Sequence, residues 1–105
     1  MGMKEIQKEV NKWARQYKKP YWPIKDQMLR LQEEIGELSR EINHLYGSKK
    51  KKSTESKRNL GDELSDVIFT ICCMANSKGI NLQEEWDRMM KEKLYGRDNE
   101  RYRKR

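Results

Sequence analysis

The sequence predicts a small all-α domain, and three observations point to that class. Apolar residues recur at spacings of three and four along most of the chain, which is the period of a helix with one buried face. The 105 residues include only two Pro and six Gly, and few are β-branched, so helix is favoured over sheet. Hydrophobic residues make up 34% and charged residues 39%. That ratio is lean for a self-sufficient core, so we expect oligomerisation to complete a helical bundle.

The length fits a single domain spanning residues 1–105. The first helix is predicted over residues 3–18, because its apolar positions share one face; they are Ile6, Val10, Trp13, Ala14 and Tyr17. Pro20 and Pro23 stop this helix and stiffen the loop between them.

The second helix is predicted over residues 24–46 and is closed by Gly47. Its apolar stripe follows a 3.6-residue period and consists of Ile24, Met28, Leu31, Ile35, Leu38, Ile42 and Leu45. Residues 47–57 contain no apolar side chain but four consecutive lysines, Lys49–Lys52. Like charges repel and extend a chain, so we expect a flexible basic linker here.

The third helix is predicted over residues 58–78, with Gly79 closing it. It is apolar on several sides, which is typical of a central helix contacted by more than one neighbour. Asn81 is a suitable N-cap for a fourth helix, with a glutamate three residues later as in a capping box. Gly96 is expected to end that helix, leaving a frayed basic tail over residues 96–105.

The formal net charge of +7 is concentrated in two segments. Residues 47–58 carry +5 and residues 96–105 carry +3, so the rest of the chain is near −1. Solvated, mobile segments explain this pattern, and an electrostatic funnel for a polyanionic substrate is the functional alternative. A nucleic-acid binder usually shows a basic stripe along a helix or sheet, so nucleic acid is not the expected partner.

The cysteines and the hydropathy indicate a cytoplasmic protein. Cys72 and Cys73 are adjacent in an apolar run and cannot form a disulfide with each other in a helix. They are predicted to be small buried hydrophobes in a reducing compartment. No apolar stretch reaches the length of a membrane span, and the N-terminus lacks a signal-peptide core.

Two helices each carry a pair of acids three residues apart, which places both on one helix surface. The pairs are Glu34 with Glu37 and Glu63 with Asp66. At about 100° per residue, each pair lies on the same flank of its apolar stripe, so antiparallel packing could bring the four together. Clustered carboxylates raise one another's pKa, and a hard divalent cation such as Mg²⁺ removes that conflict. The alternative is that these acids are ordinary solvated charges.

The motif Glu33-Glu34-x-x-Glu37, followed after 25 residues by Glu63-x-x-Asp66, resembles the signature of MazG-like nucleotide pyrophosphohydrolases, in the all-α NTP pyrophosphatase superfamily. The segments LQEEIGEL, LGDELSDVIF and ANSKGINLQEEW resemble the family's metal-binding helices and the turn into its last helix. The resemblance covers about residues 6–102. It implies a four-helix hairpin protomer that assembles into homodimers or homotetramers, with the active site near the subunit interface.

The resemblance also implies the site chemistry, which is Mg²⁺-dependent cleavage of a nucleoside triphosphate between its α and β phosphates. The implied metal ligands are Glu34, Glu37, Glu63 and Asp66. Glu33 is the extra acid of the motif, and it either orients water or a ligand or is simply an exposed helix charge.

Further residues are candidates for binding the substrate. The resemblance suggests phosphate contacts from Lys93, Arg97 and Arg101, and the alternative is a basic, fraying C-terminus. Trp22 lies between prolines and could stack on a base, whereas Trp13 falls on an apolar stripe and is expected in the core. Asn76 could contact substrate or help to end the third helix.

Three functions are therefore open. The first is a house-cleaning enzyme that hydrolyses nucleoside triphosphates to the monophosphate and pyrophosphate, with Lys49–Lys52 as a flap over the phosphates or merely an exposed insertion. The second is a basic helical binding module for nucleic acid or an acidic protein, whose affinity would fall steeply with salt. The third is a structural helical oligomer, which metal would not stabilise.

Overall fold

The computed structural model describes residues 2–47 and 56–101, and within these ranges every regular element is helical. The helices are α1 (Met3–Ala14), α2 (Ile24–Tyr46) and α3 (Ser56–Ser77). A continuous helical run follows, made of α4 (Leu82–Arg88), η1 (Met89–Asp98) and α5 (Asn99–Arg101). The all-α prediction is confirmed. The predictions for linker residues 48–55 and for the tail beyond residue 101 lie outside the described residues. Residues 56 and 57 were predicted to belong to the linker, but they begin α3.

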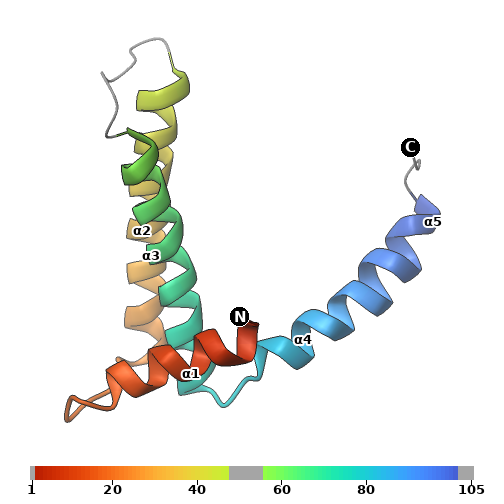
Figure 1. The fold of residues 1–105 in the computed structure, drawn as a ribbon, viewed down its shortest axis with the longest axis horizontal. Coiled ribbons are helices and arrows are strands. Elements are labelled where there is room, and N and C mark those ends of the chain that lie inside the picture. Colours follow the sequence, from red (N-terminus) through yellow and green to blue (C-terminus); the bar gives the residue numbers. More distant parts are fainter. Residues whose placement is uncertain (1, 48–55, 102–105) are drawn as a thin grey trace.

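α2 and α3 form a hairpin that stands upright in Figure 1, and both views place the two helices side by side. α2 has the predicted bounds, because Pro23 precedes its first turn and Gly47 follows its last. The N–H of Gly47 donates to the oxygen of Asn43 at 2.9 Å. A Cβ at Gly47 would collide with that oxygen, so the close approach requires glycine.

α3 ends as predicted at a glycine in the left-handed region, since Gly79 has φ 66°. The N–H of Ile80 donates to the oxygen of Ala75 at 2.9 Å, and the N–H of Gly79 donates to the oxygen of Asn76 at 3.3 Å. These two bonds are the Schellman arrangement that satisfies the last carbonyls of a helix. The chain then turns directly into α4, where Asn81 Oδ1 accepts the N–H of Glu84 at 3.2 Å and acts as the predicted cap.

Two predicted boundaries are wrong. α1 ends at Ala14 rather than near residue 18, because the N–H groups of Gln16 and Tyr17 bond three residues back and tighten the chain into turns. The prolines ahead of it disfavour helical backbone at the residues that precede them. At the other end, Gly96 lies within η1 and does not end the helix. A glycine inside a helix costs only about 1 kcal/mol, and it terminates a helix chiefly when it adopts positive φ.

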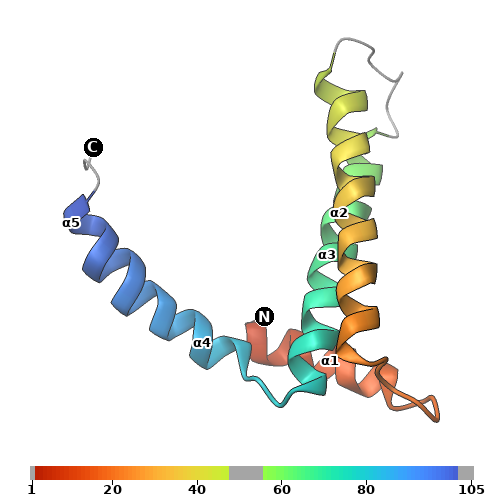
Figure 2. The ribbon, with the colours of Figure 1, turned by 180° about the vertical axis from the view of Figure 1, so that it is seen from behind.

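α1 crosses the base of the hairpin, and the small core lies where it meets α3 (Figure 2). The buried apolar residues are Val10, Ala14, Cys72 and Ala75. A larger set of apolar side chains on α2 and α3 is exposed, including Leu29, Ile35, Ile42, Leu64, Ile68 and Ile71. The structure therefore leaves much of the hairpin's apolar surface uncovered in the single chain. None of the described helices is long and apolar enough to cross a membrane.

Candidate metal and nucleotide site

Three acids from the two helices of the hairpin converge. Glu34, Glu37 and Glu63 each place one carboxylate oxygen within 4.8 Å of the others. Glu34 and Glu37 share a surface of α2 because they are three residues apart, and α3 runs alongside to supply Glu63. We call these three residues the acid cluster. The convergence of acids from both helices was predicted from the sequence.

The acid cluster holds more negative charge than its surroundings compensate. Glu34 is only 5% exposed, and its Oε1 accepts from Nε of Arg30 at 2.9 Å. Oε2 of Glu34 and Oε2 of Glu63 are buried and accept no hydrogen bond from the described residues. Burial, followed by the nearby Glu37 carboxylate, raises the pKa of Glu63. Buried carboxylate oxygens without partners are costly, so the cluster favours either a proton or a bound cation.

The donor set fits a hard divalent cation. All three groups are carboxylates, which suit Mg²⁺, Ca²⁺ and Mn²⁺ rather than metals that prefer sulfur or imidazole. The buried unpaired oxygens of Glu34 and Glu63 are the observation that supports this fit. As ligands they would gain the partner that the described residues do not provide.

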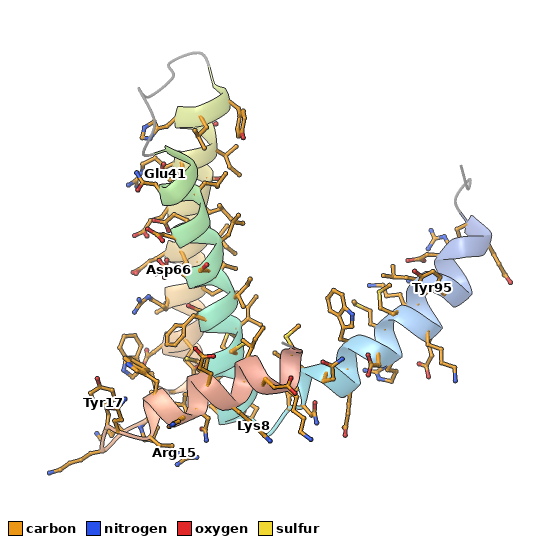
Figure 3. All side chains as sticks on the ribbon, viewed as in Figure 1. Lys8, Arg15, Tyr17, Glu41, Asp66 and Tyr95 are labelled. Atoms are coloured by element: carbon orange, nitrogen blue, oxygen red, sulfur yellow. The ribbon has the colours of Figure 1, made fainter. Side chains whose placement is uncertain are left out.

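Two predicted site acids lie outside the acid cluster. Asp66 is one turn further along α3 and is exposed (Figure 3), although its charge contributes to the raised pKa of Glu63. Glu33 is exposed on α2, and its charge helps to raise the pKa of Arg30. Both acids therefore act electrostatically on the site, and their roles toward metal or substrate stay predictions.

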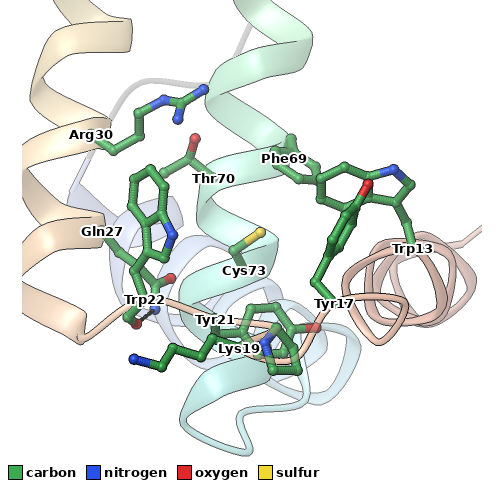
Figure 4. A pocket seen from close by; sticks show the side chains of 11 residues that line it. Trp13, Tyr17, Lys19, Tyr21, Trp22, Gln27, Arg30, Phe69, Thr70 and Cys73 are labelled. Carbon is green, nitrogen blue, oxygen red and sulfur yellow. Dashed lines mark hydrogen bonds between the residues drawn. The ribbon is translucent and has the colours of Figure 1, made fainter.

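An aromatic pocket adjoins the acid cluster. It has a volume of about 420 Å³, within the usual range for small-ligand sites. Its aromatic lining residues are Trp13, Tyr17, Tyr21, Trp22 and Phe69. Trp13 meets Phe69 edge to face with centroids 5.6 Å apart, and it is 51% exposed (Figure 4). The expectation that Trp13 belongs to the core is wrong for the single chain, because its face of α1 borders the open pocket and the ring lies on the pocket wall.

The loop between α1 and α2 is fixed by hydrogen bonds that set the position of Trp22. Nε2 of Gln27 donates to the main-chain oxygen of Trp22 at 2.6 Å. The hydroxyl of Tyr21 donates to Oδ1 of Asn11 at 2.6 Å and accepts from Nδ2 of Asn76 at 3.1 Å. These hydrogen bonds within the protein hold the loop in place, and the Trp22 side chain that it carries is 55% exposed.

The side-chain amide of Asn76 forms hydrogen bonds that hold several helices together. Its Oδ1 accepts from Nε2 of Gln7 at 2.9 Å, and its Nδ2 also donates to the main-chain oxygen of Gln7 at 3.0 Å. Gln7 in turn accepts the N–H of Leu82 at 2.8 Å and donates to the oxygen of Ile80. Asn76 thus joins α1, α3, the Tyr21 loop and the start of α4. A direct contact between Asn76 and substrate stays a prediction.

Arg30 is the site residue that sequence reasoning missed. It stands four residues before Glu34, and its guanidinium carbon lies 5.8 Å from the centroid of the Trp22 ring. Figure 4 shows it at the edge of the aromatic pocket. The signal was present, since an arginine and a glutamate four residues apart face each other on a helix.

The predicted phosphate ligands are not brought to the acid cluster within one chain. Lys93 and Arg97 lie on η1 and Arg101 on α5, and this arm leads away from the hairpin in both views (Figures 1 and 2). Nε of Arg97 contacts Oδ1 of its neighbour Asp98 at 3.2 Å. In this structure these cations lie away from the acids of their own chain.

Known proteins resemble this chain in sequence and in fold. The family model of the MazG nucleotide pyrophosphohydrolase domain matches residues 24–102. YpjD of Bacillus subtilis (strain 168), an uncharacterized protein, is 46% identical over 100 residues, which are 95% of this chain and 89% of YpjD.

Two solved structures extend the likeness to three dimensions. The crystal structure of YpjD, suggested there to be a pyrophosphatase, superposes with a TM-score of 0.81 at 45% identity, covering 90% of this chain and 96% of that one. The Bacillus-conserved MazG protein, a nucleotide pyrophosphohydrolase, superposes with a TM-score of 0.76 at 41% identity, covering 88% of each chain. By sequence and by fold, this chain belongs to the MazG nucleotide pyrophosphohydrolase family.

Proposed function

We propose that this protein is a Mg²⁺-dependent hydrolase that converts nucleoside triphosphates to the nucleoside monophosphate and pyrophosphate. The observation that carries the proposal is the convergence of three carboxylate oxygens within 4.8 Å. Two of the three residues have a buried oxygen without a hydrogen-bond partner among the described residues. Membership of the family supports nucleotides as the substrate class and a metal as the cofactor. Nucleotide pools are cytoplasmic, and that compartment is part of the proposal.

In this proposal Glu34, Glu37 and Glu63 hold the cation, and Asp66 joins them when substrate is bound. Mg²⁺ would neutralise the triphosphate and lower the barrier to attack by water. A carboxylate that is not bound to the cation, such as Glu33, accepts the proton of the attacking water. Attack at the α phosphorus breaks the bond to the bridging oxygen, which leaves with pyrophosphate.

The base is proposed to enter the aromatic pocket and to stack on Trp22, because the indole is exposed and held in place by its loop. Aromatic stacking accepts many bases, so the pocket offers affinity with little discrimination.

The proposed working form is a homodimer or homotetramer in which the exposed apolar faces of the hairpins meet. Burying those faces supplies the core that the single chain lacks. In such an assembly, Lys93, Arg97 and Arg101 of one chain reach the phosphates bound at the acids of another. Their positive charge would then stabilise the departing pyrophosphate.

The test is a screen of ribo- and deoxyribonucleoside triphosphates with Mg²⁺, measuring pyrophosphate and orthophosphate separately. We expect pyrophosphate with at least one nucleotide, and loss of about 10²-fold or more in kcat for Glu37→Gln. Glu9→Gln is the matched control, because Glu9 is an exposed helical glutamate outside the site. Orthophosphate as the sole product, or full turnover by Glu37→Gln, would refute the proposal. Salt-sensitive binding of nucleic acid without turnover would favour the binding-module alternative.

A further inference from the structure

Arg30 has two partners that belong to different parts of the site. Its Nε donates to Oε1 of Glu34 at 2.9 Å, which ties it to the acid cluster. The same guanidinium lies 5.8 Å from the centroid of the Trp22 ring, which ties it to the aromatic pocket. Arg30 therefore stands where the metal end and the base end of a bound nucleotide would meet.

Arg30 is the partner that can leave its ion pair with Glu34. The Arg30 side chain is 45% exposed, whereas the Glu34 side chain is 7% exposed, so the arginine is the partner that can move. Only Nε engages Glu34, and the other guanidinium nitrogens make no hydrogen bond to the described part of the chain. Guanidinium groups bind phosphate oxygens through two N–H donors at once, which an isolated Nε contact does not use.

A divalent cation at the unpaired Oε2 of Glu34 would share this carboxylate with Arg30, which is bound to Oε1. Each stabilises the charge of Glu34, and the two positive charges repel each other at short range. Metal bound at Glu34 would therefore weaken the ion pair and make the guanidinium beside Trp22 available to another anion. The Arg30 guanidinium is well suited to bind a phosphate group, and it would become available when a cation is bound and the site can accept a nucleotide.

We propose that Arg30 is an exchangeable internal counterion, which occupies Glu34 when no metal is bound and moves to the phosphate chain of the nucleotide when a divalent cation takes Glu34. This inference rests on the proposed function. It makes Arg30 a substrate-binding residue whose availability depends on metal, and it couples the acid cluster to the aromatic pocket.

The test measures binding without turnover, by calorimetric titration of the full chain with Mg²⁺ and then with inorganic tripolyphosphate at saturating Mg²⁺. For Arg30→Gln we expect Mg²⁺ affinity about three- to tenfold higher than in the wild type, because a competing cation is gone. We expect tripolyphosphate affinity about tenfold lower, because a charged phosphate contact is lost. Lys25→Gln removes the same charge from an exposed position of the same helix, away from the acid cluster, and should change neither affinity by more than about twofold.

Tryptophan emission gives an independent signal, because Mg²⁺ should move a cation from the face of Trp22. The change should vanish in Trp22→Phe. Two results for Arg30→Gln would overturn the inference. One is an unchanged or weaker affinity for Mg²⁺, since Arg30 would then merely orient Glu34. The other is an unchanged affinity for tripolyphosphate. If the wild type binds Mg²⁺ and Glu37→Gln does not, the acid cluster is a metal site. Either of these Arg30→Gln results then refutes only the role of Arg30. Absence of Mg²⁺ binding in the wild type refutes the proposed function as well.

Discussion

Glu63 is held where its negative charge is unfavourable. One of its oxygens is buried without a hydrogen bond from the described residues, and burial and the Glu37 carboxylate raise its pKa. For a carboxyl group of raised pKa, the folded protein binds the proton more tightly than the unfolded chain. The stability that this proton provides is complete below the unfolded pKa and is lost as the pH rises through the folded pKa. At neutral pH, the Glu63 carboxylate therefore lowers the stability of the metal-free fold, a cost that the proposed cation would offset.

Glu63→Gln should consequently raise the melting temperature of the metal-free protein at pH 8, because the amide carries no charge to repel. The advantage should shrink toward pH 4, where the wild-type carboxyl is protonated in both states. Thermal unfolding at several pH values, with and without Mg²⁺, measures both effects. The variant should gain less from Mg²⁺ than the wild type. A melting temperature below that of the wild type at pH 8 without metal would contradict the assigned cause.

Trp22→Ala should raise KM for the preferred nucleotide by about tenfold, because stacking of a base on an aromatic ring is worth about 1–3 kcal/mol. Stability should change little, since the side chain is 55% exposed. Steady-state kinetics and thermal unfolding measure the two quantities. Trp22→Phe, which keeps a ring in the same place, should recover most of the affinity. Equal KM values for the alanine and phenylalanine variants would remove Trp22 from the base site.

At the level of single residues, sequence reasoning succeeded where one helix period decides the outcome. Glu34 and Glu37 share a surface of α2, and the flank on which they lie is also the one that meets Glu63. It failed for Arg30 and Trp13. Whether Arg30 faces Glu34 or solvent depends on a side-chain conformation, and the exposure of Trp13 depends on which neighbours cover its face of α1. Neither is determined by spacing.

Helix ends were predictable where residue type decides the backbone conformation. Proline before α2 has a fixed φ, and the glycines after α2 and α3 lack the Cβ that would clash or be strained there. Those ends agree with the sequence to within one or two residues. The ends of α1 and of the C-terminal run depend on hydrogen bonds between neighbouring turns, which composition does not reveal. Gly96 and Gly79 show the difference, since the same residue type continues a helix in one place and closes it in the other.

A matched pair of glycine substitutions tests that explanation. Gly79→Ala should destabilise the protein by about 1–2 kcal/mol, because φ is 66° and a Cβ is disfavoured there. Gly61→Ala, inside α3 with open space around the added Cβ, should stabilise it by up to about 1 kcal/mol. Urea unfolding gives both values. Equal effects at the two sites would show that backbone conformation is not what closes α3.

The whole molecule is extended rather than compact, with a radius of gyration of 17.0 Å. About 13 Å is expected for a compact chain of 100 residues. The arm of η1 and α5 and the apolar faces of the hairpin are both uncovered in the single chain. The low hydrophobic fraction predicted this need for further burial. The sequence could not predict its geometry, because periodicity does not show which elements of one chain contact each other.

Mixing two inactive variants should restore activity if the basic residues of η1 and α5, which form the arm, act at the acid cluster of another chain. Glu37→Gln disables the acid cluster, and a variant with Lys93, Arg97 and Arg101 changed to glutamine disables the arm. After denaturation, mixing in equal amounts and refolding, half of the dimers should contain one chain of each kind. One of the two sites in such a mixed dimer would combine intact acids with an intact arm. Pyrophosphate release should then reach about a quarter of the wild-type rate, with each variant refolded alone as the control. If each arm instead folded back onto its own hairpin, every site would keep one defect, and mixing would restore nothing.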